Sequence, residues 1–114
     1  MIEKEILDYL NSADVGLSAP VYMEQPLTKP NTFFLMEKTS ESVENQIKRA
    51  TIVIQSYAAS LYSASTMSEE VIAAMLNMIS EDGISRVSLN SNSNFTDATA
   101  KQYRYQTTFV VTFY

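Results

Sequence analysis

The chain of 114 residues contains no cysteine and no histidine. Without cysteine no disulfide can form, and without either residue the usual zinc sites and haem ligation by imidazole are excluded. Catalytic triads that need an imidazole or a thiolate are excluded for the same reason. We therefore expect no enzyme, no cofactor and no metal site in this protein.

Basic residues are also scarce. Eight Lys and Arg residues stand against thirteen Asp and Glu residues, which gives a formal net charge of −5. A protein that recognises duplex nucleic acid normally needs a basic face. The first ten residues, MIEKEILDYL, lack a basic region followed by an apolar run, and no window approaches the ~18 apolar residues of a membrane span. We expect a soluble, intracellular protein that neither recognises a nucleic-acid sequence nor binds a membrane.

The remaining composition is that of a globular domain. Hydrophobic residues make up 46% of the chain and charged residues 18%, and a chain of this length buries roughly 65% of its unfolded surface. No internal repeat or change in composition marks a boundary, so we expect one domain over residues 1–114.

The spacing of apolar residues predicts two helices and up to five strands. The helices are expected at 2–10 and 60–80, and the strands at 21–23, 32–39, 46–57, 84–89 and 102–114, with polar connections at 40–45 and 90–101. The prolines around the strand at 21–23 confine it to an edge or a loop. The order α-β-β-β-α-β-β favours an α+β fold, in which a mostly antiparallel sheet of four to five strands carries both helices on one face.

The second helix has defined start and stop signals. Ser60 is a candidate N-cap, and a later start at Thr66, with Glu69 completing a capping box, is the alternative. Gly83 follows the helix as a residue that tolerates a left-handed conformation. The expected inner stripe is Leu61, Ala64, Ser68, Val71, Met75 and either Met78 or Ile79.

The closing strand at 102–114 is the stretch around which the chain is organised. Its odd-numbered residues form one aromatic and β-branched face, while Val110 adds an apolar residue to the other face. The runs at 33–36 and 52–54 are also apolar on both faces. Two helices cover only one face of the sheet. Each aliphatic side chain that stays exposed to water loses roughly 1.5–3 kcal/mol of stabilisation from burial. Either the sheet curls to cover itself, or another copy of the chain covers it; we favour the second.

Other polar clusters have ordinary explanations. The carboxylate pairs at 69–70 and 81–82 lie at predicted helix ends, where acids complement a helix dipole. The polar segment at 90–101 lacks the regularly spaced carboxylates of a calcium loop. The run YRY at 103–105 interleaves aromatic and basic residues as single-strand binders do, but it holds a single cation in an acidic chain.

Two stretches resemble a known family. They are ATIVIQSYAASLY at 50–62, and ISRVSLNS at 84–91 with NFTD at 94–97 and KQYRYQ at 101–106. Both are similar to small tail-completion proteins of phages and prophages of Gram-positive bacteria. These are tail terminators or head–tail joining proteins, sometimes labelled minor capsid proteins, and the likeness runs from the strand at 33–35 to Tyr114.

The resemblance implies an α+β subunit that forms a ring, usually a hexamer. Such a ring caps the tail tube, stops its growth and offers a surface to head-completion proteins. The expected partners are thus further copies of the chain, the tail tube protein and a head-completion protein. The expected location is the tail or neck of the virion, with assembly in the host cytoplasm. The alternatives are a neck or capsid-associated adaptor and a small non-viral ligand-binding domain.

The resemblance carries no catalytic residues with it. We expect the ring contacts on the outer hairpin at 37–49 and on the exposed side of the closing strand. The candidate interface residues are Glu37, Lys38, Lys48, Arg49, Tyr103, Arg104, Tyr105 and Val110.

Overall fold

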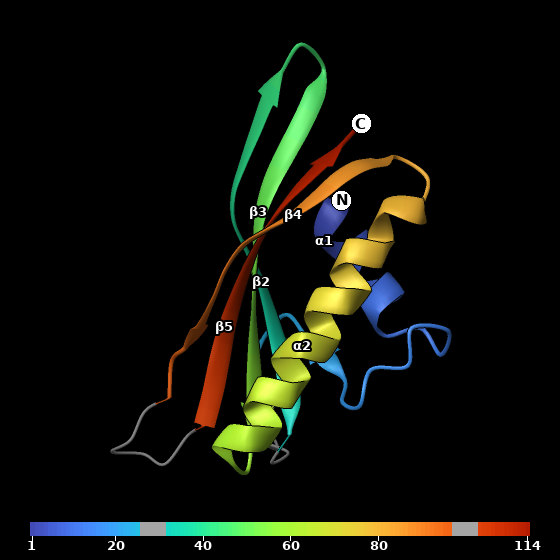
Figure 1. The fold of residues 1–114 in the computed structure, drawn as a ribbon. Helices are drawn as coiled ribbons and strands as arrows, with labels where there is room; N and C mark the ends of the chain where they lie inside the picture. The colour runs from blue at the N-terminus through green and yellow to red at the C-terminus, as the bar shows by residue number, and fades with distance from the viewer. Residues whose placement is uncertain (26–31, 97–102) are drawn as a thin grey trace.

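A computed structural model describes residues 1–25, 32–96 and 103–114. The described chain is an α+β fold in which a five-stranded sheet carries two helices on one face (Figure 1). The elements are α1 (Ile2–Leu10), β1 (Val21–Tyr22), β2 (Phe33–Glu44), β3 (Ile47–Ala58), α2 (Leu61–Asn77), the short 3₁₀ helix η1 (Met78–Ser80), β4 (Ile84–Asn94) and β5 (Tyr103–Phe113). The fold class and the element order predicted from the sequence are confirmed.

The sheet has the strand order β1-β2-β3-β5-β4. The closing strand β5 therefore lies inside the sheet, paired antiparallel with β3 and with β4. β2 and β3 form an antiparallel hairpin that projects beyond both helices (Figure 1). β1 pairs in parallel with β2, so the sheet is mixed. β1 has only two residues and lies at the edge of the sheet, which agrees with the prediction made from its flanking prolines.

The core lies between the sheet and the two helices. Alternate side chains of each strand point inward, which is the period-2 pattern of a sheet with one buried face. The fully buried large side chains include Phe34 and Met36 of β2, Ile52 and Ile54 of β3, Phe109 and Val111 of β5, Ile6 and Leu10 of α1, and Val71 and Met75 of α2. Both helices thus contribute to one continuous cluster.

The second helix begins where the first sequence signal placed it. The Ser60 Oγ accepts a hydrogen bond from the Ser63 backbone N–H at 3.2 Å, so the alternative start at Thr66 is wrong. The expected stripe is buried from Ala64 to Met78 (Ala64, Ser68, Val71, Met75 and Met78), and Met67 and Ala74 join it.

Its two end residues are not part of the stripe. Leu61 is 41% exposed in the first turn, and Ile79 is 54% exposed in η1. Met78 follows Met75 by three residues and is buried on the same stripe, while the next residue, Ile79, points about 120° away from it in the 3₁₀ turn.

The hairpin connection is shorter than expected. The predicted connection at 40–45 is wrong, because β2 continues to Glu44 and β3 begins at Ile47. Only Asn45 and Gln46 connect them, with positive φ angles of 51° and 67°, as in a two-residue type I′ turn. Four of residues 40–44 are polar, and all five are exposed, Val43 included, so the hydrophobic pattern does not identify this segment as a strand.

A similar error affects the fourth strand. The predicted loop at 90–101 begins too early, because β4 runs to Asn94 and pairs with β5 up to Tyr105; residues 97–101 lie outside the described residues. Asn92 ties this part of β4 to the layer of helices, since its Nδ2 donates to the Ser68 Oγ at 3.3 Å and its Oδ1 accepts from the Thr107 Oγ1 at 3.2 Å. Polar side chains here take part in the fold.

The turn generates a stability prediction. A residue other than glycine in the left-handed region is strained by roughly 1–2 kcal/mol, and Gln46 lies there. We expect Gln46→Gly to raise the free energy of unfolding by roughly 0.5–1 kcal/mol once the extra chain entropy of glycine is subtracted. Urea denaturation measures this. Gln46→Ala is the matched control and should give no gain; equal gains in both variants would contradict the turn geometry.

Candidate functional site

The face of the sheet opposite the helices is the main candidate for an interaction surface. We call it the open face, because no helix of the described chain covers it (Figure 1). By register, its side chains are Phe33, Leu35, Glu37, Ser40, Ser42 and Glu44 of β2, Ile47, Arg49, Thr51, Val53, Gln55 and Tyr57 of β3, Arg104, Gln106, Thr108, Val110 and Thr112 of β5, and Arg86, Ser88, Ser91 and Ser93 of β4. It combines aliphatic, hydroxyl, amide, carboxylate and guanidinium groups.

The apolar part of the open face is narrower than the sequence predicted. Leu35, Val53 and Val110 are half-buried and lie on a diagonal across β2, β3 and β5. Phe33 is already buried, because its ring stacks on Tyr57 with centroids 4.6 Å apart. Threonine and glutamine occupy most of the remaining central positions. The sheet thus covers part of its apolar surface itself and leaves one apolar stripe half-exposed.

One end of the open face is closed by a network around Arg104. Its guanidinium lies 5.7 Å from the Tyr57 ring centroid and 6.0 Å from that of Phe95. The Arg104 Nε donates to the Phe95 carbonyl at 2.8 Å, and Nη1 donates to the Tyr57 hydroxyl at 3.0 Å. That hydroxyl donates to Gln55 Oε1 at 2.8 Å, and Gln55 Nε2 donates to Gln106 Oε1 at 3.1 Å. These contacts tie β3 and β5 to Phe95, which directly follows β4.

The neighbouring tyrosines do not extend this network. Tyr103 and Tyr105 alternate to the helix side, where they pack against the core. The sequence run YRY therefore does not present its aromatic rings on the same face as its cation. Stacking of single-stranded nucleic acid needs aromatic rings and cations on the same face. The arrangement of residues 103–105 therefore does not support single-strand binding by this run.

The hairpin carries cations on both faces. Lys38 points to the helix side, where its Nζ lies 3.4 Å from Glu3 Oε1 and 3.1 Å from Glu41 Oε1. The hydrogen bond to Glu41 is the main reason that the pKa of Lys38 is raised. Lys48 also points to the helix side, with Nζ 5.9 Å from the centroid of Phe113. Arg49 points the other way, onto the open face.

The eight candidate interface residues are thus divided between two surfaces. Four lie on the open face: Glu37, Arg49, Arg104 and Val110. The other four lie on the helix side: Lys38, Lys48, Tyr103 and Tyr105.

The sequence analysis did not identify Arg86 as a residue of the open face. Arg49 pairs with Thr112 in β5, and Thr112 pairs with Arg86 in β4. Arg49 and Arg86 therefore form one row across three strands. The alternation within 84–89 indicated that Arg86 and Ser88 share a face, but only the strand order shows which face.

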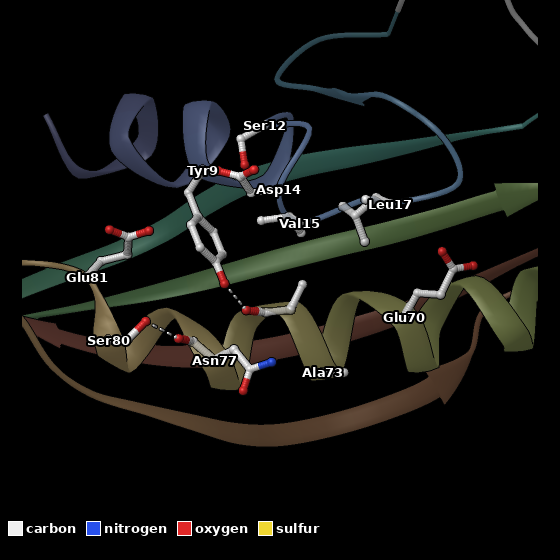
Figure 2. Close-up of a pocket in the computed structure, with 12 residues that line it drawn as sticks. Tyr9, Ser12, Asp14, Val15, Leu17, Glu70, Ala73, Asn77, Ser80 and Glu81 are labelled. Atoms are coloured by element: carbon white, nitrogen blue, oxygen red, sulfur yellow. Dashed lines mark hydrogen bonds between the residues drawn. The ribbon is translucent and has the colours of Figure 1, made fainter.

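A second surface feature is a groove between α1 and the α2–η1 segment. It consists of two adjoining cavities of about 440 and 510 Å³ that share Tyr9, Ser12, Asp14 and Glu81. Figure 2 shows the residues that line the first of them. The second cavity is lined by five acidic residues and no basic one: Glu5, Asp8, Asp14, Glu81 and Asp82. The sequence did not predict this groove, since the carboxylates come from three separate segments.

Tyr9 reaches across the groove and joins its two walls. Its hydroxyl donates a hydrogen bond to the Ala74 carbonyl at 2.8 Å (Figure 2). Burial raises the pKa of Tyr9, and the nearby Glu81 carboxylate raises it further. Both effects disfavour the charged phenolate, as expected for a partly buried hydroxyl beside a carboxylate.

The described residues also set limits on the chemistry. In residues 1–25, 32–96 and 103–114, no group of three or more acidic side chains is arranged to hold a metal ion. No helix in the same ranges is long and apolar enough to cross a membrane. A scan against models of known protein families and a search of curated proteins both give no match to this chain.

The two faces of β5 should respond differently to a charge. Val110 is half-buried on the open face, whereas Val111 is fully buried against the helices. We expect Val110→Lys to change the free energy of unfolding by less than about 1 kcal/mol, because the long side chain reaches water. Val111→Lys places an unpaired charge in the core and should cost more than about 4 kcal/mol. Urea denaturation followed by circular dichroism compares the two; unfolding by Val110→Lys would place that residue in the core.

Proposed function

We propose that this protein is a structural virion protein, a tail terminator. In this role it forms a ring at the head-proximal end of a phage tail tube, stops tube growth and joins the tail to the head. It acts by binding and not by catalysis. Its location is then the tail or neck of the virion, after assembly in the host cytoplasm.

The positions of the family-like segments support this proposal. The stretch at 50–62 covers most of β3 and the start of α2, and those at 84–91 and 101–106 fall on β4 and on the start of β5 within the described residues. β3, β5 and β4 are consecutive in the sheet. The resemblance therefore concentrates on three adjacent strands and one helix start.

The uncovered face is the observation that carries the proposal. A sheet with one face on a helical layer and a long second face without cover is suited to association with further protein. The aliphatic diagonal supplies apolar area, while threonine, glutamine and arginine supply hydrogen bonds, and arginine is enriched at protein interfaces. In the described chain the outer edge of β4 has no pairing strand, and β1 pairs with only two residues of β2. Faces and edges are both available to other subunits.

Termination requires two unlike surfaces. One surface must bind the last ring of the tube. The other must not bind a further tube subunit, but must bind a head-completion protein. A small mixed fold with a sheet on one side and helices on the other offers such a difference. Specificity of this kind depends on rejecting the wrong partner as well as binding the right one.

The proposal is tested by assembly of the purified protein. Light scattering should give a mass well above the 12.8 kDa of one chain, and negative-stain images should show closed rings, on their own or on the ends of tail tubes. Added protein should also halt the lengthening of tail tubes in vitro. Val110→Lys is the control that should stay folded and fail to assemble, because it places a charge on the aliphatic diagonal.

Two outcomes would redirect the proposal. A monomer at every concentration, with no binding to tail tubes, would count against a tail terminator. Binding to the portal side of the head, without binding to the tube end, would indicate a neck adaptor instead.

A further inference from the structure

Charge is distributed unevenly between the two sides of the molecule. Arginine side chains stand on the open face, whereas most carboxylates stand on the layer of helices. The acidic residues of that layer are Glu3, Glu5, Asp8, Asp14, Glu69, Glu70, Glu81 and Asp82. The open face also carries Glu37 and Glu44, but these eight of the thirteen acidic residues of the chain lie on the helix side.

The basic part of the open face is the row Arg49–Thr112–Arg86. Two strand spacings separate the arginine backbones, about 10 Å. Both side chains are exposed, and neither forms an ion pair with another described residue. The Arg86 Nε donates to the Ser88 Oγ at 3.0 Å, which steadies the side chain and leaves its outer donors available. Val110 lies beside this row, one position along β5 on the same face.

The acidic groove has the complementary character. Of the five carboxylates that line its second cavity, only Asp8 has a basic partner, Lys4, at 2.8 Å in an exposed ion pair. The groove also presents apolar surface from Val15 and Leu17 in the first cavity and from Ile84 in the second. It thus offers carboxylates for guanidinium groups and apolar walls for an aliphatic side chain.

We infer that the open face of one copy docks onto the α1–α2 groove of the next copy, with the row Arg49–Thr112–Arg86 against the groove carboxylates. This inference rests on the proposed ring and specifies its subunit contact. The two surfaces lie on opposite sides of the chain (Figure 1), so each copy gives one surface and receives the other. Such a heterologous contact closes into a ring when the rotation between neighbours closes.

The dimensions allow a contact of adequate size. The Cα extents are 45 × 27 × 25 Å, so a broad face exceeds the ~800 Å² that each partner contributes to an interface of standard size. Charge attraction contributes much of this contact, so assembly weakens as salt screens it. At about 1 M salt the screening length falls to ~3 Å, and we expect rings formed in dilute buffer to dissociate.

Charge-reversal variants test which face of the hairpin makes the subunit contact. Arg49→Glu combined with Arg86→Glu should raise the concentration needed for half-maximal assembly by at least about 100-fold, because like charges then meet. Lys48→Glu is the matched control, since Lys48 is adjacent in sequence but points to the helix side, and it should assemble like the unmodified chain. Melting curves confirm that each variant is folded.

A mixing experiment tests whether the open face binds the groove of a second copy. Glu81→Lys combined with Asp82→Lys places two cations in the groove lining and changes the formal charge of its five acidic positions from −5 to −1. This double variant should also abolish assembly, while Glu69→Lys, outside the groove lining, should not. An equimolar mixture of the open-face and groove double variants should form rings again, because each then offers the charge that the other needs. Light scattering and negative-stain imaging measure all arms.

The result that overturns the inference is distinct from failure of the proposed function. If the unmodified protein forms rings and the two double variants form them equally well, the contact lies elsewhere and the tail-terminator proposal stands. If each double variant fails and the mixture also fails, the arginine row and the groove carboxylates do not face each other across the contact, and the inference is wrong. Loss of rings in Lys48→Glu would place the contact on the helix side of the hairpin.

Discussion

The pairing of β5 with both β3 and β4 is the interaction on which the rest of the structure depends. It inserts the last strand into the sheet, which places Val111 in the core and Val110 on the open face. The same pairing sets Thr112 between Arg49 and Arg86, two residues far apart in the chain. Core packing on one side of β5 therefore fixes which charged side chains are neighbours on the other side. A shift of one residue in the strand pairing would exchange the two faces of β5.

Local periodicity was sufficient to predict the element order and most inward faces. It worked where a segment has one buried side, as in β3 and α2, because burial then alternates with the period of the backbone. It failed at 40–44 and 90–94, where strand residues are exposed and polar side chains are compatible with either a strand or a loop. For the candidate site, period-2 alternation correctly assigned Val110 to the face opposite Val111. The arginine row and the groove depend on contacts between distant segments, which no local pattern reports.

The chemistry of the open face is intermediate between a core and an ordinary solvated surface. Three half-buried aliphatic side chains, Leu35, Val53 and Val110, offer only a few kcal/mol of further burial, at most about 1.5–3 kcal/mol each. Threonines and glutamines around them keep the uncovered sheet compatible with water. In the proposed ring, polar and charged groups rather than the aliphatic diagonal would then decide which partner binds.

The charge arrangement also selects among the ways in which two copies can meet. A two-fold contact between open faces would bring Arg49 and Arg86 near the same residues of the partner, and a two-fold contact between grooves would oppose Glu81 and Asp82 to their own copies. An isologous contact centred on the arginine row or on the groove therefore places like charges together, which costs several kcal/mol in the worst geometries. Glu37 and Glu44 also lie on the open face, but the contact of an open face with a groove is the one that sets both arginines of the row against carboxylates. An interface between unlike surfaces continues from copy to copy until it closes, so the same electrostatics that disfavour a dimer favour a ring.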